Sequence, residues 1–338
     1  MVTHLPVVDL NDYPDPVYSR GLYLPHLDLW LDARKPQPVS VVSHAHSDHT
    51  AQHDTIIATP ETAILAQFRR GAMEVIELSY GQPWQAPDGR FTLTLQPAGH
   101  TLGSAQTIID EPNGRRTVYT GDFKLRDPLH GPPAPIIPCH VLIMEATFGK
   151  PGYVFPPDEA QVERLYRLCH AALAEGAVPV VFGYAIGKAQ MALTLLLQGR
   201  FEVLAHGSVD NIAALYRESG VRFPGTWERY TAGRDHLAGK VLVAPTNTVK
   251  SRMIQNLTPR KLVYLSGWGM DANARWRLGV DEVIPLSDHA DWTDLNRYVA
   301  EAQPQRVYTA HGFPDLARHL RREGFDAQHL ETHQLELF

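Results

Sequence analysis

Short, mostly apolar runs alternate with polar and glycine-containing turns along this chain of 338 residues. An apolar run of this length, bounded by turn residues, is typical of a buried strand. Such runs lie at 39–42, 117–120, 141–144, 262–265, 282–285 and 306–309. Patterns typical of helices lie at 61–70, 158–175, 188–198, 209–218, 291–302 and 314–323. This mixture of strands and helices predicts an α/β protein.

Residues 156–259 differ in their pattern of expected helices and strands from the segments on either side of them. Helix and strand alternate there regularly, with strands expected at 179–182, 201–205 and 240–244. We therefore expect a small α/β domain at 156–260, inserted into a larger domain that is made of residues 1–155 and 261–338.

The composition is that of a well-packed globular protein, with 44% hydrophobic and 20% charged residues. The start shows no secretory signal and no long apolar run occurs, so we expect a cytoplasmic protein that does not enter a membrane. Cys139 and Cys169 are too few for a disulfide framework and have no metal-ligand spacing. A net charge of −6 argues against binding nucleic acid by bulk charge, although bound metals or a local basic groove would still hold phosphates.

The segment 43–50 places three histidines and an aspartate directly after the strand expected at 39–42. Neutral imidazole and carboxylate are usual protein ligands of zinc. His44 and His46 can face one ion, while Asp48 and His49 turn toward a second position beside it. A surface loop that happens to be rich in histidine is the alternative, but the density of the cluster favours a metal site.

Ionisable residues follow several other expected strands, which indicates one shared edge where ligands collect. A site begun by His44 and His46 needs a third nitrogen, and His100 is the best candidate, although a lone histidine at a strand end is more often structural. Asp122 is the candidate bridge between two cations, because a carboxylate offers two oxygens. Further strand ends carry Glu145, His289 and His311.

Several candidates have a plain structural alternative. Asp32 is either a carboxylate that orients a metal-bound histidine or an ordinary turn residue. For Glu145 the alternative is a helix N-cap or a surface acid, but the repeated ionisable strand ends favour a place at the shared edge. Gly187 and Lys188 stand at a strand-to-helix turn, where free backbone N–H groups favour an anion, but a helix with a solvated lysine could simply begin there. Ser266, at another strand end, is a further candidate for phosphate binding.

The motif at 44–49, followed by His100 and then Asp122, resembles the metallo-β-lactamase superfamily. The segments 145–149, 187–190, 266–268, 287–291 and 310–312 further resemble the β-CASP nucleases, the branch that processes nucleic acids. Length and layout are most similar to the bacterial ligase-associated DNA exonucleases, a group similar to the nuclease of messenger-RNA 3′-end processing and to Artemis-like repair nucleases. The insert is short beside those of the larger RNA enzymes, and Lys188 stands where many relatives have arginine.

The resemblance implies a four-layer αβ/βα sandwich with an inserted, β-CASP-like α/β domain. It also implies two divalent metal ions as cofactors, zinc or alternatively manganese. The implied ligands of the first ion are His44, His46 and His100. Those of the second ion are Asp48, His49 and His311, and Asp122 is the implied bridge between the two ions.

The implied reaction is hydrolysis of a phosphodiester by a water that the two cations activate. Asp48, Glu145 and His289 are the implied catalytic residues, with His289, oriented by Glu145, as general acid. The implied function is a DNA exonuclease that acts on single strands in DNA repair, in association with a DNA ligase and a helicase. The inserted domain would cover the open metal edge and form a narrow cleft.

Three alternatives remain open. An RNA-processing nuclease is the nearest, because nothing in the motifs separates RNA from DNA. A thioester or lactone hydrolase of the same fold would use the same metals but has no need of the insert or of the Glu145 and His289 pair. A non-catalytic scaffold is disfavoured because every expected metal position is filled.

Overall fold

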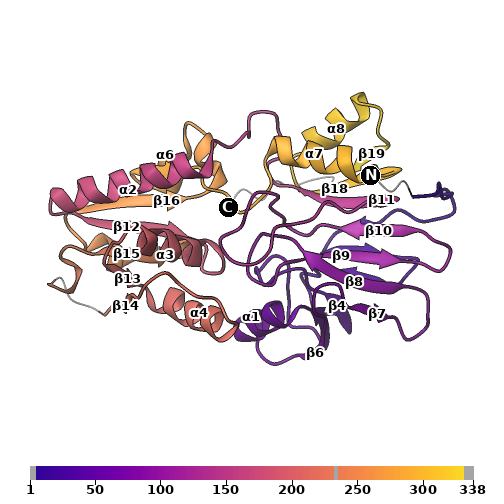
Figure 1. Cartoon of the computed structure of the whole chain (residues 1–338), viewed down its shortest axis with the longest axis horizontal. Helices are drawn as coiled ribbons and strands as arrows, with labels where there is room; N and C mark the ends of the chain where they lie inside the picture. Colours follow the sequence, from indigo (N-terminus) through magenta and orange to yellow (C-terminus); the bar gives the residue numbers. More distant parts are fainter. Residues whose placement is uncertain (1–4, 232–234, 331–338) are drawn as a thin grey trace. The chain divides into compact units, whose positions relative to one another are not determined.

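The computed structural model describes residues 5–231 and 235–330 (Figure 1). The chain divides into two compact units. The first comprises the described residues up to Val154 and those from His289 onward, and the second is Phe155–Asp288. Each unit has sheets and helices of its own and is described separately.

The first unit begins with a six-stranded sheet in the order β1-β2-β3-β4-β5-β6. The strands β1 to β3 pair antiparallel, and β3 to β6 pair parallel. Alternation of buried leucines with half-buried residues explains β2 and β3, because successive side chains of a strand face opposite sides. The strands are β1 (Val17–Tyr18), β2 (Leu22–Leu24), β3 (Leu29–Leu31), β4 (Val39–Val41), β5 (Thr55–Ala58) and β6 (Glu74–Glu77).

A single helix, α1 (Pro60–Arg70), packs against β5 and β6. It begins after Thr59, whose hydroxyl accepts a hydrogen bond from the backbone N–H of Thr62 at 3.2 Å. That bond satisfies one of the N–H groups that a helix start leaves without an internal partner. The buried face of α1 includes Leu65 and Ala66.

A seven-stranded sheet completes the strands of the first unit, in the order β19-β18-β11-β10-β9-β8-β7. Strands β7 to β10 are paired antiparallel, whereas β10, β11, β18 and β19 are parallel neighbours. The strands are β7 (Pro83–Gln85), β8 (Thr92–Pro97), β9 (Ala105–Asp110), β10 (Arg116–Tyr119), β11 (Val141–Ala146), β18 (Arg306–Gly312) and β19 (Ala327–His329).

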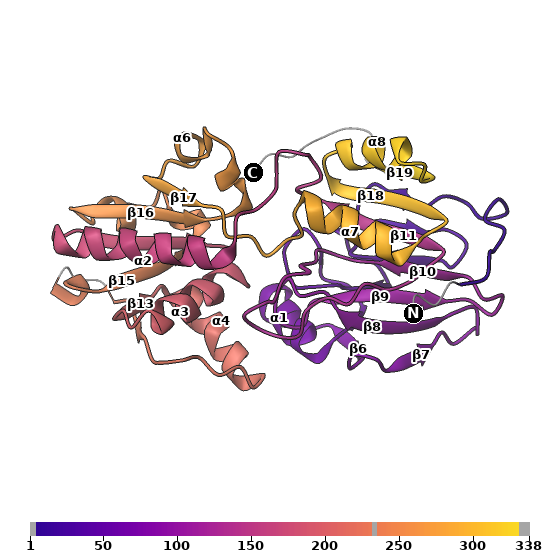
Figure 2. The same cartoon turned by 45° about the horizontal axis from the view of Figure 1, so that its top comes forward.

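The seven-stranded sheet buries both of its faces. On one face, Leu93 and Ile143 join a core with Leu31 of the six-stranded sheet. On the other face, Leu142 packs with Val299 of α7 (Trp292–Ala302), and α8 (Asp315–Arg322) contacts β18 and β19. Both helices are drawn in yellow beside β18 in Figures 1 and 2. Burial on two faces explains why β11 is a continuous apolar run and does not alternate.

The second unit contains one parallel six-stranded sheet, in the order β14-β13-β15-β12-β16-β17. The helix α2 lies along β16 in Figure 2 and contacts β12 and β16. Apolar clusters cover both faces of the sheet, as parallel sheets require. The strands are β12 (Val178–Gly183), β13 (Val203–Ala205), β14 (Glu228–Arg229), β15 (Val241–Pro245), β16 (Arg260–Leu265) and β17 (Glu282–Ile284), and the helices are α2 (Asp158–Ala174), α3 (Lys188–Gln198), α4 (Gly207–Glu218), α5 (Arg252–Gln255) and α6 (Ala274–Leu278).

Two features of the fold differ from the expectation. The last two strands of the parallel sheet, β16 and β17, carry it from Arg260 to Ile284, whereas the sequence assigns residues 261–338 to the larger domain. Glu145 and His311 lie within β11 and β18 and not after them, because these two strands stay paired to their ends through a bulge at Glu145.

No helix among the described residues is long and apolar enough to cross a membrane.

Truncation of one core leucine tests the packing between the two sheets of the first unit. Leu93 is 0% exposed and Leu129 is 41% exposed. We expect Leu93→Ala to lower the free energy of unfolding by about 2–5 kcal/mol, because it leaves a cavity. The matched change Leu129→Ala should cost no more than about 0.5 kcal/mol. Urea unfolding measures both, and equal effects would contradict this assignment of the core.

Candidate metal centre

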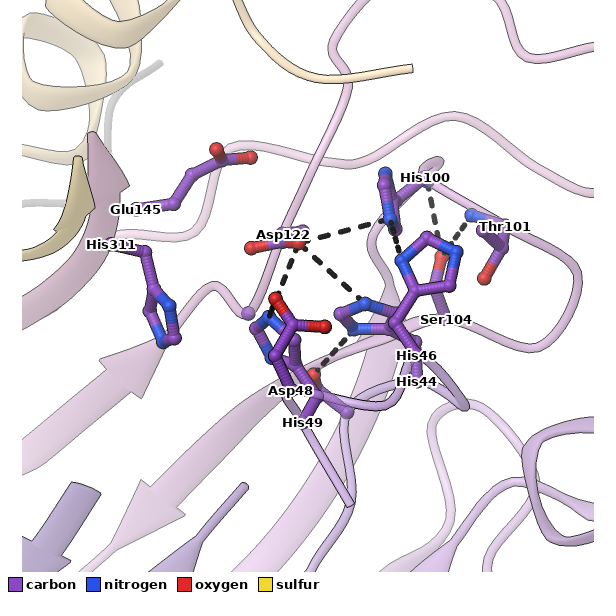
Figure 3. A network of polar contacts seen from close by, with 12 residues as sticks. His44, His46, Asp48, His49, His100, Thr101, Ser104, Asp122, Glu145 and His311 are labelled. Carbon is purple, nitrogen blue, oxygen red and sulfur yellow. Dashed lines mark hydrogen bonds and ion pairs between the residues drawn. The ribbon is translucent and has the colours of Figure 1, made fainter. Parts of the chain in front are cut away.

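The strands of the seven-stranded sheet bring four expected site residues to one edge. β8 and β10 both pair antiparallel with β9, so they run in the same direction, and β11 and β18 run parallel to β10. The carboxyl ends of these four strands therefore share an edge. His100, Asp122, Glu145 and His311 lie at or just beyond those ends, and Figure 3 shows them around the loop 43–50 that follows β4.

Four side chains form the tightest part of this cluster. His44, His46, His100 and Asp122 each place one donor atom within 4.8 Å of the others. His100 Nε2 lies 3.2 Å from His46 Nδ1. One oxygen of Asp122, Oδ2, lies 3.6 Å from His44 Nε2 and 3.8 Å from His100 Nε2. His44 and His46 are neighbours in one loop, whereas His100 and Asp122 are distant from them in the sequence, and the fold brings the donor atoms of all four together.

Two buried atoms of the cluster have no hydrogen-bond partner within the described protein, His44 Nε2 and Asp122 Oδ1. A buried polar atom without a partner is costly, so each such atom calls for an explanation. Burial and the neighbouring His49 hold the pKa of His44 well below its usual range, which keeps its imidazole neutral. A neutral imidazole and a carboxylate are the ligands that zinc takes, so these residues fit a metal ion.

Asp122 is an ionised carboxylate at the middle of the cluster. Burial opposes its ionisation, but His49 and other imidazoles outweigh burial and hold the pKa of Asp122 well below its usual range. Its Oδ2 also lies 3.3 Å from His49 Nε2. One oxygen of Asp122 thus lies within 4 Å of imidazole nitrogens from both expected ligand sets, and its role as a bridge stays a prediction.

Asp48 and His311 lie near His49 but are held less closely. His49 Nε2 is 3.8 Å from Asp48 Oδ2, and the rings of His49 and His311 stack with centroids 4.6 Å apart. Burial and His49 lower the pKa of His311 to about 4, so its imidazole is neutral. Among the described residues, the donor atoms of Asp48 and His311 lie outside every set that falls within 4.8 Å. The side chain of Asp48 is 59% exposed.

The carboxylate of Asp32 holds the other side of His49. Its Oδ2 accepts hydrogen bonds from Ser43 Oγ at 2.6 Å and from the Tyr119 hydroxyl at 2.8 Å, and lies 2.8 Å from His49 Nδ1. Its Oδ1 accepts from the backbone N–H of Ser43 at 2.7 Å. A carboxylate on Nδ1 places a proton there and directs Nε2 toward the cluster. This geometry favours the orienting role of Asp32 over that of a plain turn residue.

Glu145 and His289 form a separate pair beside Asp122. His289 Nδ1 lies 2.9 Å from Glu145 Oε2, and the backbone N–H of Phe123 donates to Glu145 Oε1 at 2.7 Å. Burial raises the pKa of Glu145 above its usual value, although His289 lowers it. The His289 ring lies 4.5 Å from the His100 ring between centroids. Glu145 therefore engages Nδ1 of His289 and fixes the position of the ring.

Two glycines allow the segments of the centre to approach one another. Gly121 has φ +55°, and a Cβ there would lie 2.7 Å from the side chain of Ser43. Gly312 has φ +140°, and a Cβ there would lie 2.0 Å from the carbonyl oxygen of Ala146. Both positions favour glycine for conformation and for space. They explain why glycine precedes Asp122 and follows His311.

Known proteins similar to this chain carry names from nucleic-acid processing. A "Probable DNA ligase" of Opitutus terrae is 40% identical over 326 residues, which is 96% of this chain and 32% of the ligase. "Transcription termination factor FttA" of Methanothermobacter thermautotrophicus is 31% identical over 43% of this chain and 22% of that protein. "Endoribonuclease YSH1" of Eremothecium gossypii is 31% identical over 30% of this chain and 13% of that protein. The chain thus spans a third or less of these relatives.

These relatives support a metallo-β-lactamase/β-CASP nuclease family for this chain. No protein-family model matches it. Among solved structures, a protein of unknown function from Enterococcus faecalis V583 aligns with a TM-score of 0.60 and 17% identity over 87% of this chain and 79% of that one. This likeness concerns the fold alone, and the mixed α/β architecture with several sheets is consistent with a metallo-β-lactamase-like fold.

The residues that the sequence offers for binding phosphate already have hydrogen-bond or ion-pair partners inside the second unit. The Gly187 N–H donates to Gln190 Oε1 at 2.8 Å. Lys188 is 2% exposed, and its Nζ donates to the Leu286 carbonyl at 3.0 Å and pairs with Asp288 at 2.9 Å. Lys188 is therefore not a solvated lysine. Ser266 Oγ accepts from the backbone N–H of Trp268 at 3.3 Å. Phosphate binding by these residues stays a prediction without support from their geometry.

Sequence reasoning missed several residues that touch the candidate site residues. Ser43 and Tyr119 bind Asp32, the Tyr18 hydroxyl lies 3.1 Å from His311 Nε2, and Arg34 Nη2 lies 3.4 Å from His311 Nδ1. They come from separate strands and turns, and serine, tyrosine and arginine form no metal-ligand motif. Only Ser43 carried a signal, since it borders the histidine cluster.

Replacement of Asp32 tests the orienting role. Asp32→Asn keeps the shape but removes the charged acceptor opposite His49 Nδ1, so we expect the affinity for zinc to fall about 10- to 100-fold. Asp28 shares the left-handed backbone, with φ +51° against +50°, and its side chain is exposed, so Asp28→Asn is the matched control. Competition with a coloured chelator measures both constants. Equal affinities for the two variants would contradict the orienting role.

Proposed function

We propose that this chain is a metal-dependent nuclease that hydrolyses phosphodiester bonds of nucleic acid, as a DNA exonuclease on single strands. The observation that carries the proposal is the cluster of His44, His46, His100 and Asp122, with two buried atoms that have no hydrogen-bond partner in the described protein. The Glu145 and His289 pair beside Asp122 gives the same centre a proton donor. Relatives named for DNA ligation, transcription termination and RNA cleavage support nucleic acid as the substrate class.

Two divalent ions, zinc or alternatively manganese, are the proposed cofactors. His44, His46 and His100 would hold one, Asp48, His49 and His311 would hold the other, and Asp122 would serve both. Such ions lower the pKa of a water and polarise a phosphoryl oxygen, which makes a nucleophile available at neutral pH.

The chain itself would supply the proton for the leaving group. Glu145 holds His289 by Nδ1, and the charge of the carboxylate stabilises an imidazolium. Nε2 then carries the proton that passes to the departing oxygen as the phosphorus–oxygen bond breaks. Asp32 acts through His49 alone and would not touch substrate.

We propose a four-layer sandwich for the first unit and an inserted β-CASP-like domain for the second. Support comes from the shared core of the two sheets, the packing of α1 on β5 and β6, and the packing of α7 on the opposite face of the larger sheet. The parallel sheet at 178–284 supports an insert that extends beyond residue 260.

The choice between DNA and RNA rests on the relatives. The similarity that covers 96% of this chain is to a protein named as a probable DNA ligase, which supports the proposal of DNA as substrate and of action beside a ligase. A repair role, a helicase partner and a cytoplasmic location are proposed from the family resemblance alone. RNA processing is the second candidate, because a shorter match is to a protein named as an endoribonuclease. The Glu145 and His289 pair argues against a thioester or lactone hydrolase.

Loss of the shared carboxylate tests the metal-dependent reaction. We expect Asp122→Ala to lower hydrolysis at least a hundredfold while the protein stays folded, because it removes the one carboxylate that faces both sets of imidazoles. Asp127 is exposed nearby in sequence, so Asp127→Ala is the matched control and should remain active. Time courses on single-stranded DNA and RNA labelled at either end, with zinc or manganese, read out activity and polarity. A folded, metal-loaded and fully active Asp122→Ala protein would contradict the proposal.

A substrate that needs no proton tests the role of His289. We expect His289→Ala to lower cleavage of ordinary DNA by about 10²–10⁴-fold, the usual range for a general acid. With sulfur in place of the leaving oxygen, the departing thiolate needs no proton, so the deficit should shrink to a few-fold. Substrates with sulfur at the 3′ or the 5′ bridging position cover both polarities. An unchanged deficit on both substrates would exclude proton donation by His289.

A further inference from the structure

Three arginines from two elements donate to three backbone carbonyls of the ligand loop 43–50. Arg34 Nε donates to the carbonyl of Asp48 at 3.1 Å. Arg69 Nη1 donates to the carbonyl of Ala45 at 3.0 Å, and Arg70 Nη2 donates to that of Ser47 at 2.6 Å. Ala45 and Ser47 stand between expected metal ligands in the sequence, and Asp48 is itself an expected ligand.

The helix α1 joins this loop to the other ligand segment. Arg69 and Arg70 are its last two residues, and both guanidinium groups reach loop 43–50. At its first turn, the hydroxyls of Thr59 and Thr62 donate to the carbonyl of Gly103 at 2.6 and 2.8 Å. Gly103 belongs to the same turn as His100. One helix therefore holds both segments that carry the first set of imidazoles.

Arg34 joins the loop to the last ligand segment in a similar way. It follows β3, and its backbone N–H donates to the carbonyl of Arg20 at 2.7 Å, which fixes the turn that carries it. Its Nη2 lies 3.4 Å from His311 Nδ1, while its Nε holds Asp48. Arg34 therefore contacts both segments expected to hold the second ion.

The positive charge of these side chains cannot itself attract a metal. A guanidinium next to a divalent cation repels it, so on Coulomb grounds alone three arginines would weaken metal binding. Arginine does, however, form directional hydrogen bonds from a planar fork, and these bonds fix the position of an acceptor. The loop has no regular structure, and its own turn bond is His49 N–H to the His46 carbonyl at 3.2 Å.

We propose that Arg34, Arg69 and Arg70 form a clamp that fixes the conformation of loop 43–50 and thereby sets the metal affinity of the centre. The three are positioning residues, because they act through the loop and hold no metal. The inference rests on the proposed metal centre and names residues that no ligand motif predicts. Loss of one arm of the clamp frees the loop to adopt conformations that do not bind, so the metal must also supply the free energy of ordering the loop.

The sign of the change in metal affinity tests the clamp. We expect Arg34→Met, Arg69→Met and Arg70→Met each to raise the dissociation constant for zinc about tenfold, measured by competition with a coloured chelator. Removal of positive charge alone would lower that constant. Arg322 is exposed at the end of α8, so Arg322→Met is the matched control and should leave the constant unchanged. Unchanged or tighter zinc binding by the three variants would overturn the proposal.

Two further measurements separate loop ordering from general stability. Urea unfolding of the metal-free variants reports the stability that each arginine contributes, and the zinc constants are compared for variants that remain folded. Where a methionine variant does not fold, the corresponding lysine variant replaces it. Lysine keeps the positive charge but lacks the planar fork of donors, so the lysine variant should also bind zinc more weakly than the native protein. With cobalt in place of zinc, the visible spectrum should shift in the clamp variants and not in Arg322→Met. A native protein that takes up no zinc would refute the metal centre itself, whereas native uptake with unaltered variants would refute the clamp alone.

Discussion

The buried carboxylate of Asp32 is the interaction on which the rest of the centre depends. It binds Ser43 at the start of the ligand loop, Tyr119 at the end of β10 and His49 in the loop itself. Tyr119 belongs to the seven-stranded sheet, whereas Ser43 and His49 belong to the loop that follows β4 of the six-stranded sheet, so one carboxylate connects the loop to the larger sheet. A buried charge of this kind is tolerated only when its oxygens are fully hydrogen-bonded, and here four donor groups surround it.

Parallel strand direction explains the remainder of the cluster. Because β8, β10, β11 and β18 all end at one edge, side chains that are far apart in sequence collect there without any local motif. Loop 43–50 also accepts hydrogen bonds from arginines that lie outside the sheets. We propose that the sheets bring the ligands together, whereas the arginines keep the loop in one conformation.

The dense ligand loop could be predicted from the sequence because all its members lie within a few residues of one another. His100, Asp122, Glu145 and His311 could be named because each lies near the end of an expected strand, and strand ends of one direction share an edge. The sequence also placed Asp32 among the candidates, but only the structure distinguishes its orienting position from that of a turn residue. Tyr119, Arg34 and the arginines of α1 could not be predicted, since each contact joins segments that no periodicity relates.

The extent of the parallel sheet was harder to predict for the same reason. The apolar runs at 262–265 and 282–285 look alike whichever sheet they join, and only their pairing with β12 and with each other assigns them to the second unit. For Lys188 the sequence pattern was misleading. A lysine next to a glycine at a strand-to-helix turn looks suited to bind an anion, but Lys188 is buried and pairs with Asp288.

Anomalous diffraction at the zinc absorption edge, from crystals grown with zinc, tests the central claim most directly. The account predicts two peaks about 3.5–4 Å apart at the edge of the seven-stranded sheet, as in other two-metal sites. One peak should lie among His44, His46 and His100, the other beside His49, with Asp122 in contact with both. Peaks elsewhere, or no peak at these residues, would contradict the assignment of this cluster as a metal centre.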